Sequence, residues 1–144
     1  MAHAEHAVTV PHPIGEVYAF LADGLNDPKW RPDVIEVHLA SGAPSQLGAV
    51  YAQTMKGPGG RSIAGDYRIT RADVPTRLDF EVIAGPARPV GSFQLTAVSP
   101  TSTEVLFTLD LTPTGLMRLM GGMIARQVEA EAAAIKRVPG AMAG

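Results

Sequence analysis

The chain contains no cysteine, and this absence removes several classes of function at once. Disulfide frameworks, thiolate nucleophiles and zinc sites built on cysteine are all excluded. A chain without cysteine is compatible with a cytoplasmic protein, which is the compartment we expect. The first ten residues, MAHAEHAVTV, have neither a basic start nor a continuous apolar core, so they predict no signal peptide.

The chain also lacks an excess of either charge. Its 12 lysines and arginines nearly balance 14 aspartates and glutamates, for a formal net charge of −2. Such a balance leaves no electrostatic footprint for nucleic acid or an anionic membrane surface. The longest predicted helix, over 115–138, carries too many charges to cross a bilayer. We therefore expect neither nucleic-acid binding nor a membrane span, and composition leaves the oligomeric state open.

Residue patterns typical of metal sites and nucleophiles are missing too. The spacing of His3, His6 and His12 fits neither a helical metal pair nor a zinc motif, and His38 alternates with apolar residues, which places it towards solvent. No serine lies in a strained elbow motif, and no histidine–carboxylate pair can be placed in one pocket. We expect no metal and no cofactor, and the sequence names no catalytic residue.

One long helix is predicted over 115–138, the only long stretch without proline. Its roughly 24 residues would extend about 36 Å. Apolar residues recur at the spacing of one helical face: Met117, Met120, Ile124, Val128 and Ile135, with Leu116, Leu119 and Met123 widening the stripe. A second group is expected to form a solvated face: Glu129, Glu131, Lys136 and Arg137. Such a helix must bury its apolar side against a large surface.

The preceding residues supply that surface as alternating apolar and polar segments. They predict strands over 5–10, 34–41, 50–56, 63–70, 78–82, 92–97 and 104–111. Two short helices follow the first strand, one of about nine residues from Pro13 and one turn over 29–31, with Asn26-Asp27-Pro28 as its cap. Short connections make the sheet antiparallel, and one-sided alternation gives it one buried face. We predict a single α+β domain over 1–144, a curved antiparallel sheet of six to seven strands wrapped around the long C-terminal helix.

This element order resembles the START-like, helix-grip (SRPBCC) superfamily, in particular its polyketide cyclase/dehydrase branch. The resemblance covers essentially the whole chain. Three segments carry it locally: PHPIGEVYAFLAD (11–23), NDPKWRPDVIEV (26–37) and LGAVYAQTM (47–55). Within them, the matching residues are Pro13, Val17, Tyr18, Leu21, Trp30, Pro32 and Gly48. The fold hosts cyclases, lipid carriers, hormone receptors and co-chaperone domains, so the resemblance supports the fold more than a reaction.

What the resemblance implies is an apolar cavity between the helix and the sheet. Such pockets are mostly apolar, with a few polar groups that fix the orientation of a ligand. The expected ligand-binding residues are large inward candidates and a few polar groups: Trp30, Tyr51, Gln53, Tyr67, Phe80, Arg88, Phe93, Met117, Met120 and Met123. The implied partner is a small hydrophobic molecule.

Several of these residues have two interpretations. Trp30 either plugs one end of the core or lines the pocket, or does both. Tyr51 and Gln53 share a strand face that is either inward, where they need partners, or exposed. Tyr67 is expected inward, as a core tyrosine or a ligand contact. Arg88 either is a solvated loop residue or holds a ligand carboxylate or enolate at the rim.

Two features of the long helix also stay open. Its methionines either belong to the core or form an adaptable pocket wall. The pair Gly121-Gly122 marks a bend, close packing against the sheet, or a hinge at the pocket mouth.

Three functions are compatible with these residues. The first is binding of a small hydrophobic ligand, aromatic, polyketide or lipid-like, in the cavity. The second is a polyketide cyclase or dehydratase that acts mainly by folding its substrate, with Tyr51, Tyr67 or Arg88 polarising a carbonyl. The third is a protein-interaction or co-chaperone-like domain with a filled core. A cavity in the core would favour the first two functions over the third. Two or more polar groups that converge inside that cavity would favour an enzyme over a binding protein.

Overall fold

The computed structural model describes residues 2–143, except for the side chains of Pro58, Leu116, Met117 and Met120. The strands are β1 (Ala2–Val10), β2 (Val34–Ser41), β3 (Val50–Lys56), β4 (Ser62–Ala64), β5 (Tyr67–Asp73), β6 (Arg77–Val82), β7 (Val90–Ser99) and β8 (Ser102–Leu111). Between β1 and β2 lie the helix α1 (Ile14–Ala22) and the 3-10 helix η1 (Gly24–Lys29). A short 3-10 turn, η2 (Pro58–Gly60), joins β3 to β4. Four helical segments end the chain: η3 (Gly115–Met120), α2 (Gly121–Ala133), η4 (Ala134–Arg137) and α3 (Val138–Ala143).

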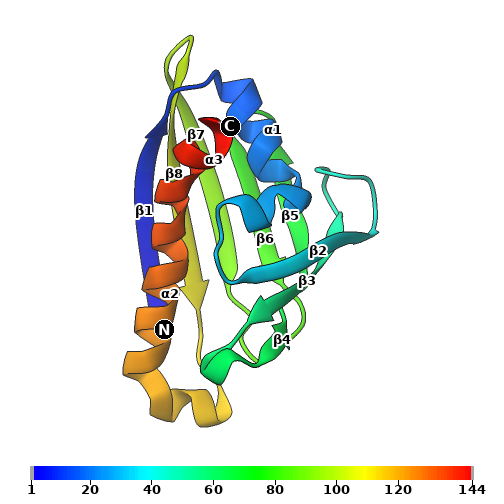
Figure 1. Cartoon of the computed structure of the whole chain (residues 1–144), viewed down its shortest axis with the longest axis vertical. Helices are drawn as coiled ribbons and strands as arrows, with labels where there is room; N and C mark the ends of the chain where they lie inside the picture. Colours follow the sequence, from blue (N-terminus) through cyan, green and yellow to red (C-terminus); the bar gives the residue numbers. More distant parts are fainter. Residues whose placement is uncertain (1, 144) are drawn as a thin grey trace.

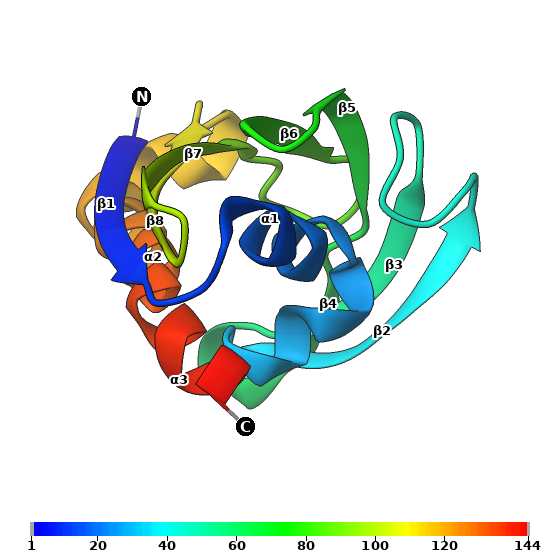
Figure 2. The ribbon, with the colours of Figure 1, turned by 90° about the horizontal axis from the view of Figure 1, so that it is seen from above.

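All strands belong to one antiparallel sheet in the order β1-β8-β7-β6-β5-β3-β2, with β4 paired to β3 (Figure 1). Seen from above, the strands curve around α1, and the C-terminal helical segments lie on the side where β1 and β2 leave the arc open (Figure 2). The predicted helix-grip fold is confirmed, with one short strand more than the six to seven expected. The first strand begins at Ala2, three residues before the predicted start, because its pairing with β8 continues to Leu111.

The C-terminal helix differs from the prediction at both ends. It continues past Val138 to Ala143, and Pro139 is tolerated because it lies in the first turn of α3, where its missing N–H costs no hydrogen bond. Its first six residues form 3-10 turns. The buried face is confirmed at Ile124, Val128 and Ile135. Leu119 and Met123 do not widen it, since they are 84% and 48% exposed.

The second short helix begins earlier than predicted. Asp23, whose carboxylate accepts from the backbone N–H of Leu25 at 3.1 Å, caps η1, so the proposed cap residue Asp27 lies inside the helix. Gly24 allows η1 to approach the sheet closely. A Cβ at this position would lie 2.3 Å from the Tyr67 hydroxyl. The early start of η1 carries the Asp27 side chain into the core.

Two predicted strands are interrupted. A bulge between Val34 and Glu36 turns Ile35 outward, where it is exposed rather than on the inner face with Val37. The strand predicted over 63–70 is two strands, β4 and β5. They separate at Gly65-Asp66, where the Asp66 carboxylate accepts the Gln53 backbone N–H at 3.2 Å.

Candidate functional site

A cavity of about 100 Å³ lies between α2 and the sheet. Its wall is mostly apolar, with Ile124 and Val128 on the helix side facing Leu109 and Leu111 of β8. Polar groups are confined to a few positions: Arg31, Lys56, Gln127 and Glu131. An apolar void with a few polar groups is the usual character of a small-molecule site. The void is comparable to an engineered apolar cavity of about 150 Å³ that takes up benzene.

A second, smaller void of about 20 Å³ lies deeper in the core. It is large enough for one water-sized group. Trp30, Tyr67, Asp27 and apolar residues of the inner core line it. Both voids share Arg31, Phe80 and Phe107 in their walls, so these three side chains separate one chamber from the other.

Aromatic rings form a continuous contact chain along the inner chamber. Phe93 and Phe107 stack with centroids 4.5 Å apart, and Trp30 meets them edge-on at 6.1 and 5.8 Å. Phe80 contacts Phe93 at 5.8 Å and Tyr67 at 5.4 Å. Pairs in these geometries contribute about 0.5–1.5 kcal/mol beyond the area they bury. Aromatic rings in contact with one another therefore form one wall of the inner chamber.

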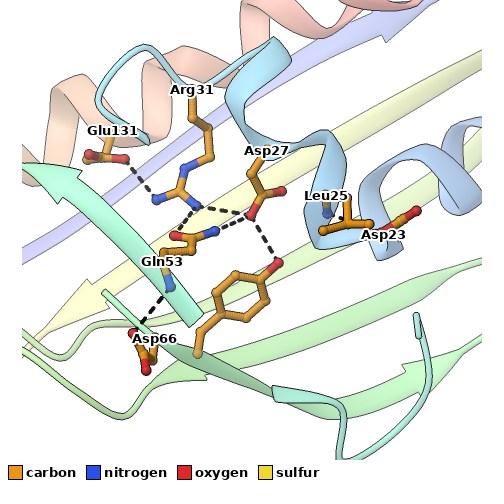
Figure 3. A network of polar contacts seen from close by, with 8 residues as sticks. Asp23, Leu25, Asp27, Arg31, Gln53, Asp66 and Glu131 are labelled. Carbon is orange, nitrogen blue, oxygen red and sulfur yellow. Dashed lines mark hydrogen bonds and ion pairs between the residues drawn. The ribbon is translucent and has the colours of Figure 1, made fainter. Parts of the chain in front are cut away.

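A buried polar cluster, which includes Asp27 and Arg31 of the chamber lining, lies beside these rings; Figure 3 shows its contacts. One carboxylate oxygen of Asp27, Oδ2, accepts three hydrogen bonds: from Gln53 Nε2 at 2.5 Å, from the Tyr67 hydroxyl at 2.9 Å and from Arg31 Nη1 at 3.5 Å. Asp27 is 4% exposed. A charge buried to this extent needs such partners. Three separate elements thus meet at one carboxylate: η1, β3 and β5.

Arg31 links this cluster to the C-terminal helix. Its Nη2 donates to Glu131 of α2 at 3.4 Å, and its Nη1 donates to the Gln53 side-chain oxygen at 3.4 Å. Glu131 was expected on a solvated face, and this prediction is wrong. Its side chain is only 19% exposed, because the helix turns it towards Arg31 rather than towards solvent.

Burial dominates the acid–base properties of the cluster. It raises the pKa of Asp27 from 3.8 to about 6, although Arg31, Tyr67 and Gln53 each favour the charged form. Burial, followed by the Asp27 charge, raises the pKa of Tyr67 well above 10. Burial by itself would lower the pKa of Arg31, but Glu131 and Asp27 outweigh it and raise that pKa above its ordinary value. A carboxyl that titrates near neutral pH can exchange a proton under ordinary conditions.

The ambiguous strand face of β3 is inward. Tyr51 is fully buried and Gln53 is 3% exposed. Their partners are protein groups: the Tyr51 hydroxyl accepts the Ser45 backbone N–H at 2.9 Å, and the Gln53 amide bonds to Asp27 and Arg31. Gln53 joins the polar cluster, whereas the Tyr51 ring stacks on Tyr67 at 5.5 Å, outside the lining of either void.

Four other predicted residues surround the inner chamber. Trp30 and Phe93 line it and are buried, so Trp30 is at once part of the core and part of a void wall. Tyr67 lines it with its hydroxyl turned to Asp27 instead of to a rim. Phe80 lines both chambers.

Two further predicted residues, Arg88 and Met123, are not brought to this site. Arg88 is exposed, and its Nε donates to the Gly85 carbonyl at 3.2 Å, while its neighbours Ala87 and Pro89 line the cavity. Met123 is exposed in a separate shallow depression with Lys56 and Gln127. The side chains of Met117 and Met120 lie outside the described residues.

Sequence reasoning did not identify Asp27, Arg31 and Phe107 as site residues. The charge pattern of the segment NDPKWRPD offered a signal, because a carboxylate and a guanidinium four residues apart can pair in a helical turn. The pattern does not show whether the side chains of that turn face the core or the solvent. That orientation depends on where η1 begins and on the tyrosines packed against Gly24.

Within residues 2–143 as described, no three histidine, aspartate or glutamate side chains gather as a set of metal ligands. Nor does any described helix combine the length and the apolar character needed to cross a bilayer.

Comparison with solved structures shows the same fold in several proteins. The Zhui aromatase/cyclase from Streptomyces sp. R1128 superposes with a TM-score of 0.73 at 17% identity, covering 95% of this chain and 92% of that chain. A START superfamily protein from Mycobacterium smegmatis gives 0.69 at 14% identity, covering 94% and 95%. One half of the di-domain aromatase/cyclase BexL gives 0.68 at 21% identity, covering 95% of this chain and 46% of BexL. None of the curated proteins compared with this chain matches it in sequence.

A family model provides the sequence evidence. The model described as "Polyketide cyclase / dehydrase and lipid transport" matches residues 1–138, nearly the whole chain. The matched residues include every strand of the sheet and the helix α2. The chain therefore belongs to the polyketide cyclase/dehydrase and lipid transport family.

Proposed function

We propose that this protein binds a small hydrophobic ligand, aromatic or polyketide-like, in the cavity between the sheet and α2. The observation that carries the proposal is the cavity of about 100 Å³, with apolar walls and Arg31 and Glu131 at one side. A filled core, as expected for an interaction domain without a ligand, would leave no such space. The family match supports a hydrophobic ligand.

The cavity as it stands fits a molecule of about one ring, since a cavity of about 150 Å³ takes up benzene. Pockets for drug-sized ligands measure about 300–1,000 Å³. A larger ligand therefore requires the wall to move outward. The segments of the wall with the least sheet pairing are β4, which pairs with β3 over three residues, and the 83–89 loop.

Native mass spectrometry of the freshly purified protein tests the proposal. We expect an adduct of a small apolar molecule, and we expect Val128→Phe to abolish it, because the larger side chain fills the cavity from the α2 side. Ala130→Phe, on the exposed face of the same helix, is the matched control and should keep the adduct. An adduct retained equally in both variants would place the ligand elsewhere.

A cyclase or dehydratase is the second candidate, favoured by the convergence of Asp27, Tyr67 and Arg31 at the inner chamber. In this role the chamber would fold a polyketide chain, and the cluster would exchange protons and polarise a carbonyl. Incubation with a linear polyketide thioester, followed by mass spectrometry, tests it. Loss of water that is slowed by Asp27→Asn supports the enzyme, and unchanged thioester limits the protein to binding.

A further inference from the structure

One oxygen of the buried Asp27 carboxylate has no hydrogen-bond partner among the described residues. The three donors that reach this side chain, from Gln53, Tyr67 and Arg31, all bond to the other oxygen, Oδ2. Figure 3 shows the free oxygen, Oδ1, turned away from Arg31 and Gln53. An ionised carboxylate accepts hydrogen bonds at both oxygens, so half of this acceptor is unused. A donor that reached Oδ1 would offset part of the free energy that burial of the charge costs.

The free oxygen faces the inner chamber. Within the described residues, three buried polar side-chain atoms lack both a partner and accessible surface: Tyr18 Oη, Trp30 Nε1 and Ser92 Oγ. Asp27 Oδ1 also lacks a partner but is not one of them, so it keeps accessible surface. Asp27 is 4% exposed and belongs to the wall of the inner chamber. The small accessible surface of Oδ1 is therefore open to this void.

The size and the charges of the inner chamber select a small neutral donor. Its volume of about 20 Å³ holds one water-sized group, such as a hydroxyl, and is too small for a ring. Asp27 and Arg31 both line it, so an anion would face the carboxylate and a cation would face the guanidinium. A hydroxyl has no charge and donates one hydrogen bond, which matches the free Oδ1.

The larger cavity provides room for a ring beside this position. Arg31, Phe80 and Phe107 belong to the walls of both voids, so a ring in the cavity of about 100 Å³ reaches the chamber by extending one substituent past them. We propose that the inner chamber is a hydroxyl site: the ligand carries a neutral hydroxyl on its ring, as a phenol does, and this O–H donates to Asp27 Oδ1. The inference rests on the proposed binding function and narrows its ligand class.

Two matched one-ring probes test the inference. In p-cresol a hydroxyl stands where p-xylene has a methyl group of similar size, and calorimetric titration measures both affinities. Water solvates the hydroxyl well, so its burial without a partner would favour p-xylene about tenfold or more. We expect p-cresol to bind at least as tightly as p-xylene at about pH 8, because the ionised Asp27 replaces the lost water as acceptor.

The variant Asp27→Asn changes the group that the chamber presents. The amide oxygen should take the place of Oδ2, where three donors converge, and the amide N–H groups should take the place of Oδ1. A charge-assisted hydrogen bond is then replaced by a neutral one at best. We expect the affinity for p-cresol to fall about tenfold relative to that for p-xylene.

Glu131→Gln is the matched control, because Glu131 is the carboxylate that lines the larger cavity. The preference for p-cresol should be unchanged in this variant. A crystal structure of the wild-type protein with p-cresol is the second measurement. We expect the hydroxyl oxygen about 2.5–3.0 Å from Asp27 Oδ1. If Asp27→Asn does not fold, this structure decides the question.

The outcomes separate this inference from the proposed function. Binding of both probes with the same affinity ratio in the wild type and in Asp27→Asn overturns the hydroxyl site and leaves ligand binding intact. Tighter binding of p-xylene, loss of the preference in Glu131→Gln alone, or a hydroxyl remote from Oδ1 in the crystal has the same meaning. Binding of neither probe overturns both. A preference for p-cresol that Asp27→Asn reduces and Glu131→Gln keeps supports both.

Discussion

Asp27 is the residue at which the fold and the site depend most on each other. Its folded-state pKa of about 6 lies above its ordinary value of 3.8, so the folded protein holds this proton more tightly than the unfolded chain. Between about pH 4 and pH 6 the unfolded state releases the proton first, and stability falls as the pH rises. A pKa difference of this size changes the free energy of unfolding by roughly 2–3 kcal/mol, at about 1.36 kcal/mol per pKa unit.

We predict that Asp27→Asn removes this pH dependence. The unfolding free energy of the variant, minus that of the wild type, should rise by roughly 2–3 kcal/mol from pH 4 to pH 7. Urea denaturation at the two pH values measures it. Glu36→Gln removes an exposed charge of the same sign and serves as the control. If the unfolding free energy of Asp27→Asn differs from that of the wild type by the same amount at both pH values, the raised pKa of Asp27 is contradicted.

Tyr67 supplies one of the three hydrogen bonds to Asp27, at 2.9 Å. Tyr67→Phe removes a donor that stabilises the charged carboxylate, so the pKa of Asp27 should rise further. Stability at pH 7 should fall by about 1–2 kcal/mol. NMR titration of the carboxyl carbon measures the first effect and denaturation the second.

Tyr51→Phe is the matched control, because the two rings stack but the Tyr51 hydroxyl bonds to Ser45 instead. The titration of Asp27 should not move in this variant. An equal displacement in both variants would mean that the rings, and not the Tyr67 hydroxyl, control the carboxylate.

The C-terminal helix carries its apolar stripe at Ile124, Val128 and Ile135 as the sequence pattern predicts, yet Leu119 and Met123 nearer its start are exposed. Gly121 and Gly122 stand where the 3-10 turns of η3 pass into α2. Among the described atoms, nothing lies within 4 Å of a Cβ built on either glycine. Close packing against the sheet is therefore not the reason for the pair, which leaves a bend or a hinge.

We predict that Gly121→Ala with Gly122→Ala stabilises the protein by about 1–2 kcal/mol, since each alanine removes backbone freedom from the unfolded chain in a helical site. Thermal denaturation measures the gain. Gly91→Ala is the contrasting variant: its Cβ would lie 2.3 Å from the Phe80 ring, and it should destabilise. Slower ligand entry in the double-alanine variant would identify the pair as a hinge, whereas a loss of stability would contradict the prediction.

The whole molecule is a curved sheet closed by one helix, and its cavity is small for the ligands that such folds can enclose. The cavity wall combines well-paired strands, such as β8, with sparsely paired segments, such as β4 and the 83–89 loop. Local opening starts where pairing and packing are weakest. We expect the molecule to admit larger ligands along this weaker side.

We predict that a three-ring ketone such as anthrone slows backbone hydrogen exchange in 62–65, 83–89 and 121–128, the segments that line the cavity, and leaves β7 unchanged. Exchange mass spectrometry with and without anthrone measures it. The proposed cavity would be contradicted by slowing confined to the separate depression around Pro44, Leu47 and Val74.

The sequence by itself determined the elements and their order. Period-two and helical spacing, interrupted by proline and glycine, are local properties, so they predicted the antiparallel sheet, the closing helix and the buried positions Ile124, Val128 and Ile135. The resemblance of 11–23, 26–37 and 47–55 to START-like proteins rested on the same local patterns.

Only the tertiary structure decided the site. The pattern of β3 left open whether Gln53 was buried, because a shift of one residue exchanges the two faces of a strand. Asp27 looked like a cap, Arg31 belonged to a short turn, and Glu131 fell on a polar helix face. These side chains meet because η1 begins at Gly24, β3 turns Gln53 inward and α2 crosses above them. Their meeting depends on contacts up to 100 positions apart in the chain, from Arg31 to Glu131, which no local period can encode.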